Sequence, residues 1–231
     1  MPEAITHPLN SMSSQLFNTT HNTLARLTLL VLVLGAAGFL GFMDLIHRSP
    51  YVRYTKVRRE QPVPFSHKHH SNMGIDCRYC HTSVEVSGFA NIPPTQTCMN
   101  CHNVIYNESE ILKPVRDSWA SGESLEWTRV HDLPDFVYFN HSIHVNKGIG
   151  CATCHGRVDQ MPLTWREKPL YMKWCLECHR DPAQNVRPKD KIFDMAFDPA
   201  SLSREEREQL VEDYGIDHHN HRLTNCAICH R

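Results

Sequence analysis

Ten cysteines supply the most direct chemical signal in this chain of 231 residues. All of them lie in five copies of one pattern, Cys-x-x-Cys-His, and none is left over. The copies are Cys77-Arg-Tyr-Cys80-His81, Cys98-Met-Asn-Cys101-His102, Cys151-Ala-Thr-Cys154-His155, Cys175-Leu-Glu-Cys178-His179 and Cys226-Ala-Ile-Cys229-His230. Two thiols at this spacing can form thioethers with the vinyl groups of a porphyrin, and the next residue can ligate its iron. The pattern predicts five covalently attached haem c groups, with the five motif histidines as proximal iron ligands.

Disulfides and zinc sites are the alternative uses of paired cysteines. Zinc sites draw four Cys or His ligands from two paired clusters. Nothing in zinc chemistry requires a histidine directly after every second cysteine, so the pattern favours haem.

Two of the motifs are preceded by an internal repeat. Residues 65–81, FSHKHHSNMGIDCRYCH, align without gaps with residues 139–155, FNHSIHVNKGIGCATCH, at an offset of 74. Each copy is followed by a second motif, so the chain divides into a di-haem module at 65–102, a di-haem module at 139–179 and a terminal haem segment at 218–231. Tandem repeats normally stack as similar units, and stacking would bring the haems into one array.

The repeated Phe-x-His-x-x-His supplies candidates for the sixth iron ligand. Imidazole in this position keeps iron low-spin and closed to substrates. Two histidines three residues apart on a helical turn point in neighbouring directions, so one can close its own module's haem and the other an adjacent haem. We therefore predict His67 and His141 as distal ligands of the first haem in their modules, with His70 and His144 closing neighbouring haems.

Several residues compete for the fifth distal position. His219 precedes Cys226 by seven residues, the offset at which His70 precedes Cys77, which makes it the first candidate. The alternatives are His69, His131, His218, His221, Met161 and Met172. A methionine ligand would give a His/Met haem of higher potential.

The composition favours a wrapper around cofactors over a protein core. Prolines number 14 and glycines 10, histidines 17, and hydrophobic residues make up 41% of the chain. The fold class we predict is mainly α and irregular, a multihaem cytochrome c domain with little regular secondary structure plus one N-terminal transmembrane helix. The formal net charge is −1, and haem propionates would make the assembled protein more acidic, so nucleic acid is not expected as a partner.

An apolar segment precedes all five motifs. Leu27 to Met43 form an uncharged run of 17 residues, and the predicted transmembrane helix covers residues 27–46. About 20 helical residues span the roughly 30 Å of bilayer hydrocarbon. The alternative is a cleaved secretory signal with Ala36 and Ala37 near the cleavage site, but the 26-residue polar leader is long for one. We expect an N-terminal cytoplasmic tail at 1–26 and a pentahaem domain at 47–231.

The basic residues around this segment and the haem-attachment motifs predict opposite orientations in the membrane. Arg26 is the one basic side chain before the run, whereas Arg48, Arg53, Lys56, Arg58 and Arg59 follow it. The positive-inside rule would place the haem domain in the cytoplasm. Haem is attached covalently on the outer side of the bacterial membrane, so we expect a single-pass protein of the bacterial inner membrane with its haem domain on the periplasmic side.

The segments between the motifs are expected to act as supports. Asn107 and Glu110 resemble the start of a capped helix, which Pro114 would kink or restart. Ser203 and Glu206 form a capping box for a helix that ends before Gly215. Residues 181–201 are expected to form an extended linker.

Four stretches of the chain carry a family resemblance. They are residues 129–144, RVHDLPDFVYFNHSIH, residues 154–162, CHGRVDQMP, residues 174–180, WCLECHR, and the terminal Cys-His-Arg at 229–231. With them the whole chain resembles the pentahaem membrane-anchored cytochrome c subunit of alternative complex III, a bacterial quinol:electron-acceptor oxidoreductase. The first Phe-x-His-x-x-His module also resembles class III multihaem cytochromes. The resemblance implies integral-membrane quinol-binding subunits, an iron–sulfur subunit, a monohaem cytochrome c and a terminal oxidase as partners.

Three functions are compatible with five haems. The first is an electron-transfer subunit of a quinol-oxidising complex, with no bond chemistry on this chain and hence no enzyme activity of its own. The second is a membrane-anchored quinol dehydrogenase feeding a periplasmic reductase, which predicts a methionine soon after the first motif, where this chain has Thr82 and Ser83. The third is a catalytic enzyme such as a nitrite reductase, which needs an open iron. The surplus of distal histidines argues against it.

Overall fold

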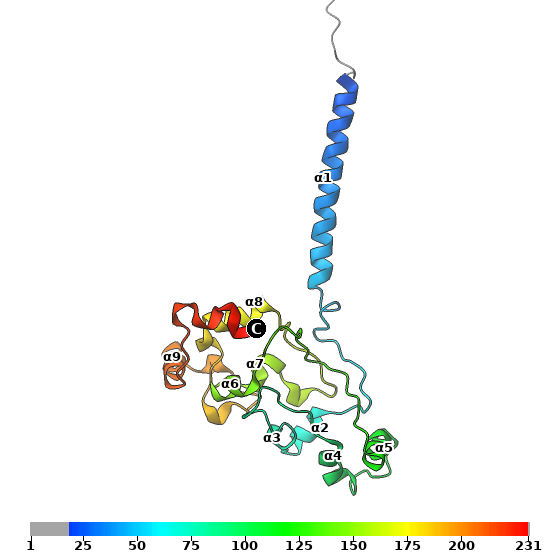
Figure 1. The fold of residues 1–231 in the computed structure, drawn as a ribbon, viewed down its shortest axis with the longest axis vertical. Coiled ribbons are helices and arrows are strands. Elements are labelled where there is room, and N and C mark those ends of the chain that lie inside the picture. The colour runs from blue at the N-terminus through cyan, green and yellow to red at the C-terminus, as the bar shows by residue number, and fades with distance from the viewer. Residues whose placement is uncertain (1–18, 231) are drawn as a thin grey trace, which may run out of the picture. The chain divides into compact units, whose positions relative to one another are not determined.

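The fold is mainly helical and irregular, as the composition predicts. The computed structural model describes residues 19–230, and it divides the chain into one unit at 1–49 and a second at 50–231 (Figure 1). No β-strand occurs between residues 19 and 230, where extended pairing is limited to the isolated bridges Thr55 with Arg166, Arg58 with Trp165, and Ile149 with Val186. Most of the predicted N-terminal tail lies outside the described residues.

The described part of the first unit, residues 19–49, contains one long helix. Helix α1, Thr19–Arg48, has 30 residues and includes the whole predicted span of 27–46. At about 1.5 Å per residue it is about 45 Å long. Its apolar side chains are exposed along its length. By length and composition, α1 can cross a bilayer.

The second unit consists of short helices joined by long irregular segments (Figure 1). The α-helices here are α2 His67–Asn72, α3 Cys77–Cys80, α4 Thr95–His102, α5 Lys113–Ser121, α6 His141–Asn146, α7 Cys151–His155, α8 Met172–Arg180, α9 Arg204–Asp213 and α10 Cys226–Cys229. The 3₁₀-helices are η1 Glu110–Leu112, η2 Val158–Gln160, η3 Pro182–Gln184, η4 Lys189–Lys191, η5 Pro199–Ser201 and η6 His219–Thr224. Such short elements gain little stability alone, so tertiary contacts must hold them in place.

The sequence repeat is also a structural repeat. Helices α2 and α6 start behind the N-caps Ser66 and Asn140, and each cap side chain accepts a hydrogen bond from a backbone N–H in the first turn. The chain then turns through Gly74 and Gly148, whose φ angles are +79° and +78°. Glycine adopts this left-handed conformation without the steric cost that a Cβ atom adds. The two copies therefore present their histidines in the same way.

Among the described residues, the buried apolar side chains form small clusters. One contains Ile149, Ala183, Val186 and Val211, and another contains Val84, Val145 and Ile192. The segment 181–201 differs from the extended linker that the sequence suggests. It folds into three 3₁₀ turns and supplies Val186 and Arg187, which are 0% and 1% exposed. This segment is part of the core because its apolar residues pack against α9 and the second module.

Two predicted helix starts can be compared with the structure. The capping box before α9 is confirmed: the Ser203 hydroxyl accepts a hydrogen bond from the Glu206 N–H at 3.1 Å, and the Glu206 carboxylate accepts one from the Ser203 N–H at 2.8 Å. The predicted cap at Asn107 is wrong: η1 begins after Ser109, which makes no side-chain cap hydrogen bond, and α5 follows with Pro114 in its first turn. Proline fits there because the first-turn N–H groups have no intrahelical partner.

Candidate functional site

Every Cys-x-x-Cys pair lies on a helical turn. Helices α3, α7 and α10 consist of the motif, whereas α4 and α8 end in it. Asp76 and Asn225 cap α3 and α10, accepting backbone hydrogen bonds of 2.8 and 2.9 Å two residues ahead. Residues three apart on a helical turn are neighbours, so the two thiols of each pair face the same side.

None of the ten thiols forms a disulfide in the structure. All ten cysteines are unpaired. Within the described part of the chain, no three His, Cys, Asp or Glu side chains converge as a metal site would require. Burial raises the pKa of Cys151 to about 11 and that of Cys154 to about 12. Burial therefore disfavours the thiolate form of both cysteines.

The motif histidines are all anchored through Nδ1. Four of the five Nδ1 atoms donate to backbone carbonyl oxygens: His81 to Asn91 at 2.7 Å, His102 to Ile105 at 3.0 Å, His179 to Leu223 at 2.8 Å and His230 to Phe136 at 3.0 Å. The fifth, on His155, lies 3.2 Å from Nε2 of His131. A carbonyl oxygen can only accept, so Nδ1 carries the proton and the Nε2 lone pair is left for a metal.

The histidines of the repeat are anchored in the same way. Nδ1 donates to a backbone carbonyl in three of them: His70 to Ser66 at 2.9 Å, His141 to Gly88 at 2.9 Å and His144 to Asn140 at 2.7 Å. Nδ1 of His67 lies 2.9 Å from the Thr164 hydroxyl. Burial, followed by the nearby His81, lowers the pKa of His67 to about 4. A neutral imidazole is the form that binds a metal.

Three repeat histidines face motif histidines across a gap of constant size. The ring centroids are 6.1 Å apart for His70 and His102, 6.4 Å for His141 and His155, and 6.1 Å for His144 and His179. Two metal–nitrogen bonds of about 2 Å, plus the half-width of each ring, give roughly 6 Å between rings that share one metal ion. These residues fit a haem iron held between two imidazoles, and the second histidine of each module faces the second motif of that module.

Phenylalanine fixes the orientation of the second histidine in each module. Phe65 stacks on His70 and Phe139 stacks on His144, both with ring centroids 4.5 Å apart. The same phenylalanines contact the first histidine of their module edge-on, at 4.9 Å and 4.7 Å. The Phe in Phe-x-His-x-x-His therefore positions both imidazoles of the motif.

The two modules dock on each other reciprocally. From the first module, the Ser71 hydroxyl donates to the carbonyl oxygen of Asp159 at 2.9 Å, beyond the third motif. From the second, the backbone N–H groups of His141 and Ser142 donate to the carbonyl oxygens of Gly88 and Ser87, beyond the first motif. Each module therefore supports the segment that follows the other module's first motif.

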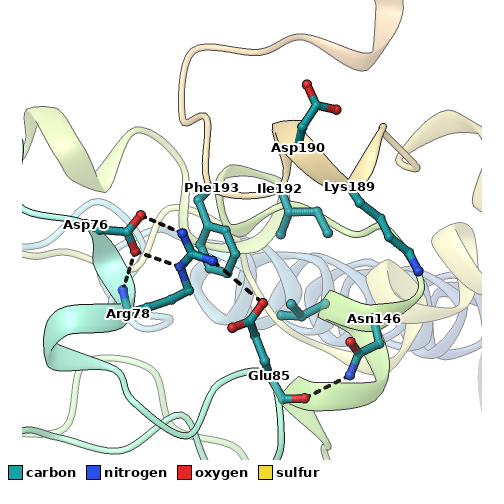
Figure 2. Close-up of a pocket in the computed structure, with 9 residues that line it drawn as sticks. Asp76, Arg78, Glu85, Asn146, Lys189, Asp190, Ile192 and Phe193 are labelled. Carbon is teal, nitrogen blue, oxygen red and sulfur yellow. Dashed lines mark hydrogen bonds and ion pairs between the residues drawn. The ribbon is translucent and has the colours of Figure 1, made fainter.

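A charged pocket marks the edge of this junction (Figure 2). It has a volume of about 410 Å³ and lies between α3, α6 and η4. Arg78 pairs with Asp76 at 2.9 Å and lies over the Phe193 ring at 4.5 Å, and Asn146 donates to the Glu85 carbonyl oxygen at 2.8 Å. Arg78 pairs with both Asp76 and Glu85, and the Asn146 hydrogen bond connects Glu85 to α6.

The terminal segment brings several candidate ligands near the fifth motif. The rings of His218 and His219 lie 4.3 Å apart, and Nδ1 of His218 lies 3.4 Å from the Ile216 carbonyl oxygen. His219 and His221 line a pocket of about 540 Å³ together with Ala227 and Ile228 of the fifth motif. The structure does not pair one of these histidines with His230, whose ring contacts Phe136 at a centroid distance of 5.7 Å.

The remaining candidates lie elsewhere. Met172, at the start of α8, is 67% exposed, whereas Met161 is 2% exposed and its carbonyl oxygen accepts a hydrogen bond from the Lys68 N–H of α2 at 3.2 Å. His131 uses Nε2, the atom with which it would bind an iron, to contact His155. Sequence reasoning missed the Nδ1 partners because most are backbone carbonyls, which any residue could supply. Thr164 carries no signal in the sequence that would single it out.

Comparison with known proteins supports the haem interpretation. Residues 45–124 match the class III cytochrome c family, which confirms the resemblance of the first module to that family. Over 181 residues the chain is 29% identical to the menaquinone reductase multiheme cytochrome c subunit of Nitratidesulfovibrio vulgaris, covering 75% of this chain and 78% of that protein.

A second relative belongs to another reductase. Over 111 residues the chain is 25% identical to the acrylate reductase cytochrome subunit of Shewanella woodyi, covering 48% of this chain and 68% of that protein. Both relatives are cytochrome subunits of reductases. Residues 45–124 are thus similar to the class III cytochrome c family, and three quarters of this chain is similar to a multihaem cytochrome c subunit of a reductase.

Proposed function

We propose that this chain is a membrane-anchored subunit that carries five haem c groups and passes electrons one at a time between a quinol-oxidising partner and an acceptor on the outer face of the membrane. The observation that carries the proposal is the set of three facing imidazole pairs, at 6.1, 6.4 and 6.1 Å, with Nδ1 anchored at each ring. Haem c, when bound, supplies one-electron redox chemistry.

The ligand assignment follows from these pairs. We propose His141 opposite His155, His70 opposite His102 and His144 opposite His179. His67 would serve the first motif, because it lies near His81 and has the same anchoring as its repeat partner. His219 is retained for the fifth motif, with His218 and His221 as its neighbours in the same pocket.

The proposed roles of the protein side chains are to hold each haem and to occupy both axial positions of its iron. Cysteine thioethers would fix each porphyrin, and two imidazoles would occupy both axial positions, so no substrate could reach the metal. The repeat histidines also set the distances between sites, because each module's helix carries ligands for two of them. This arrangement supports electron transfer without bond chemistry on this chain.

We further propose that the chain belongs to an alternative complex III. The family resemblance supports this assignment, and so does α1, which is suited to anchoring the chain among integral-membrane quinol-binding subunits. An iron–sulfur subunit would deliver the electrons, and a monohaem cytochrome c or a terminal oxidase would receive them. The haem domain would lie on the periplasmic side of the bacterial inner membrane, where haem c is attached.

A second candidate is the cytochrome subunit of a reductase. It is favoured by the names of the relatives, one a menaquinone reductase subunit and the other an acrylate reductase subunit. In that case the same haems, with both axial positions occupied, would exchange electrons with a different partner. Electrons would run either toward a quinone or from quinol to a periplasmic reductase.

The direction of electron flow in the intact complex separates these functions. The complex is purified in mild detergent, mixed anaerobically with quinol and followed by haem absorbance. The proposal predicts that quinol reduces the haems within the turnover time and that an added oxidised cytochrome c or oxidase reoxidises them. Haems that stay oxidised while quinol is turned over would contradict the proposal. So would haems that are reduced only by a soluble donor and are reoxidised by a quinone. Co-purification of a periplasmic reductase would favour the second candidate.

A further inference from the structure

One motif histidine has a different Nδ1 partner from the other four. His81, His102, His179 and His230 donate to backbone carbonyl oxygens, whereas Nδ1 of His155 lies 3.2 Å from Nε2 of His131. The two rings are 4.3 Å apart at an angle of 69°, and both side chains are partly buried. In the third motif, the Nδ1 partner of the histidine is therefore an imidazole, whereas in the other four it is a backbone carbonyl oxygen.

The direction of this hydrogen bond follows from the proposed ligation. If Nε2 of His155 binds the iron, its Nδ1 must carry the proton and donate it. His131 is then the acceptor and holds its own proton on Nδ1. An imidazole nitrogen is a much stronger base than a peptide carbonyl oxygen, so it draws the shared proton further from His155.

The neighbourhood holds His131 in this role. The Gln61 amide exchanges two hydrogen bonds with the backbone of Thr128, at 2.9 and 3.0 Å, three residues before His131. Arg59 donates to the carbonyl oxygen of Arg129 at 2.7 Å. The segment leading to His131 is thus tied to residues 59–61.

We propose that His131 is a positioning residue that lowers the reduction potential of the haem attached at Cys151 and Cys154 by accepting the Nδ1 proton of His155. A ligand whose outer partner is more basic gains electron density, which stabilises the oxidised metal more than the reduced one. The inference rests on the proposed ligation by His155. It assigns His131 a place behind the proximal ligand, in contrast to the distal position considered from the sequence.

The test is a spectroelectrochemical titration of the full-length protein carrying all its haems. His131→Ala removes the acceptor, and His131→Gln replaces it with an amide oxygen like that of the other four sites. The expected result is a rise in the midpoint potential of one haem in five. At a fixed ambient potential, the ratio of reduced to oxidised haem at that site should increase roughly tenfold in His131→Ala, equivalent to about 59 mV for one electron. His131→Gln should shift it by less.

A matched control separates positioning from loosening of the structure. Gln61→Ala breaks the two hydrogen bonds to Thr128 that help to hold His131 but removes no imidazole, so any shift in potential should be smaller than in His131→Ala. His141→Ala, which should make the same haem high-spin, identifies the site that shifts when the variants are combined. Equal shifts in Gln61→Ala and His131→Ala, or potentials unchanged in His131→Ala at full haem content, would overturn the proposal.

Two other results have clear meanings. A high-spin haem in His131→Ala would show that His131 is itself an axial ligand, and the proposal would be wrong. Fewer than five haems in the unsubstituted protein, with the third motif empty, would refute the proposed haem content and, with it, this role of His131.

Discussion

At the residue scale, the function of each histidine depends on what its Nδ1 contacts. Once a backbone carbonyl holds the Nδ1 proton, the ring can turn only its Nε2 lone pair toward a metal. His141 and His144 show how precisely this works, because they lie three residues apart and face different motif histidines, His155 and His179. Under the proposed ligation, one short helix would supply ligands to two sites.

This arrangement predicts that the two histidines can be removed independently. His141→Ala and His144→Ala should each keep all haems attached, because the thioethers come from the cysteines, and should each open one iron. Carbon monoxide should bind one haem in five in either single variant and two in five in the double variant, as measured by absorbance. The assignment fails if the double variant still binds at one haem, or if a single variant remains fully low-spin.

At the scale of elements, the repeat contains a natural control for packing. Gly74 and Gly148 occupy equivalent turns and have φ angles of +79° and +78°. A Cβ atom at Gly74 would meet nothing within 4 Å, whereas one at Gly148 would lie 2.3 Å from Cε2 of Tyr214 and 3.0 Å from the Arg187 carbonyl oxygen. The turn at Gly148 therefore packs closely against Tyr214 and Arg187, whereas the turn at Gly74 has no such contact.

The two glycines should respond differently to the same substitution. Gly74→Ala should cost only the strain of a left-handed residue, about 1–2 kcal/mol. Gly148→Ala adds overpacking against Tyr214, which costs about 1–3 kcal/mol more. Denaturant midpoints followed by far-ultraviolet circular dichroism should fall further for Gly148→Ala. Equal losses in the two variants would mean that the contact with Tyr214 does not restrain this turn.

At the scale of the whole molecule, a few protein contacts hold the haem-binding segments together. Arg187 is fully buried, and its guanidinium donates to the carbonyl oxygen of Asp194 at 3.2 Å and to the Thr153 hydroxyl at 3.3 Å. It thereby ties the 187–194 segment to the helix of the third motif. Burying a guanidinium is costly unless its donors are paired, and Nε of Arg187 has no hydrogen-bond partner among the described residues, so these two hydrogen bonds offset only part of that cost.

The sequence predicted the parts of this molecule that depend on residue type. The Cys-x-x-Cys-His turns, the paired histidines of the repeat and the capping box at Ser203 all follow from local patterns. The core role of residues 181–201 did not, because Val186 and Arg187 become buried only through long-range packing. The partner of His155 was also hidden, since nothing in the sequence places His131 beside a residue 24 positions away.

The central claim is that five haem irons are each closed by two protein ligands. The most direct measurement is electron paramagnetic resonance spin quantitation of the oxidised full-length protein, which reports both the number of ferric haems and their spin state. The account predicts five low-spin haems per chain and no high-spin signal. Fewer than five spins, or a stoichiometric high-spin haem in the unsubstituted protein, would contradict it.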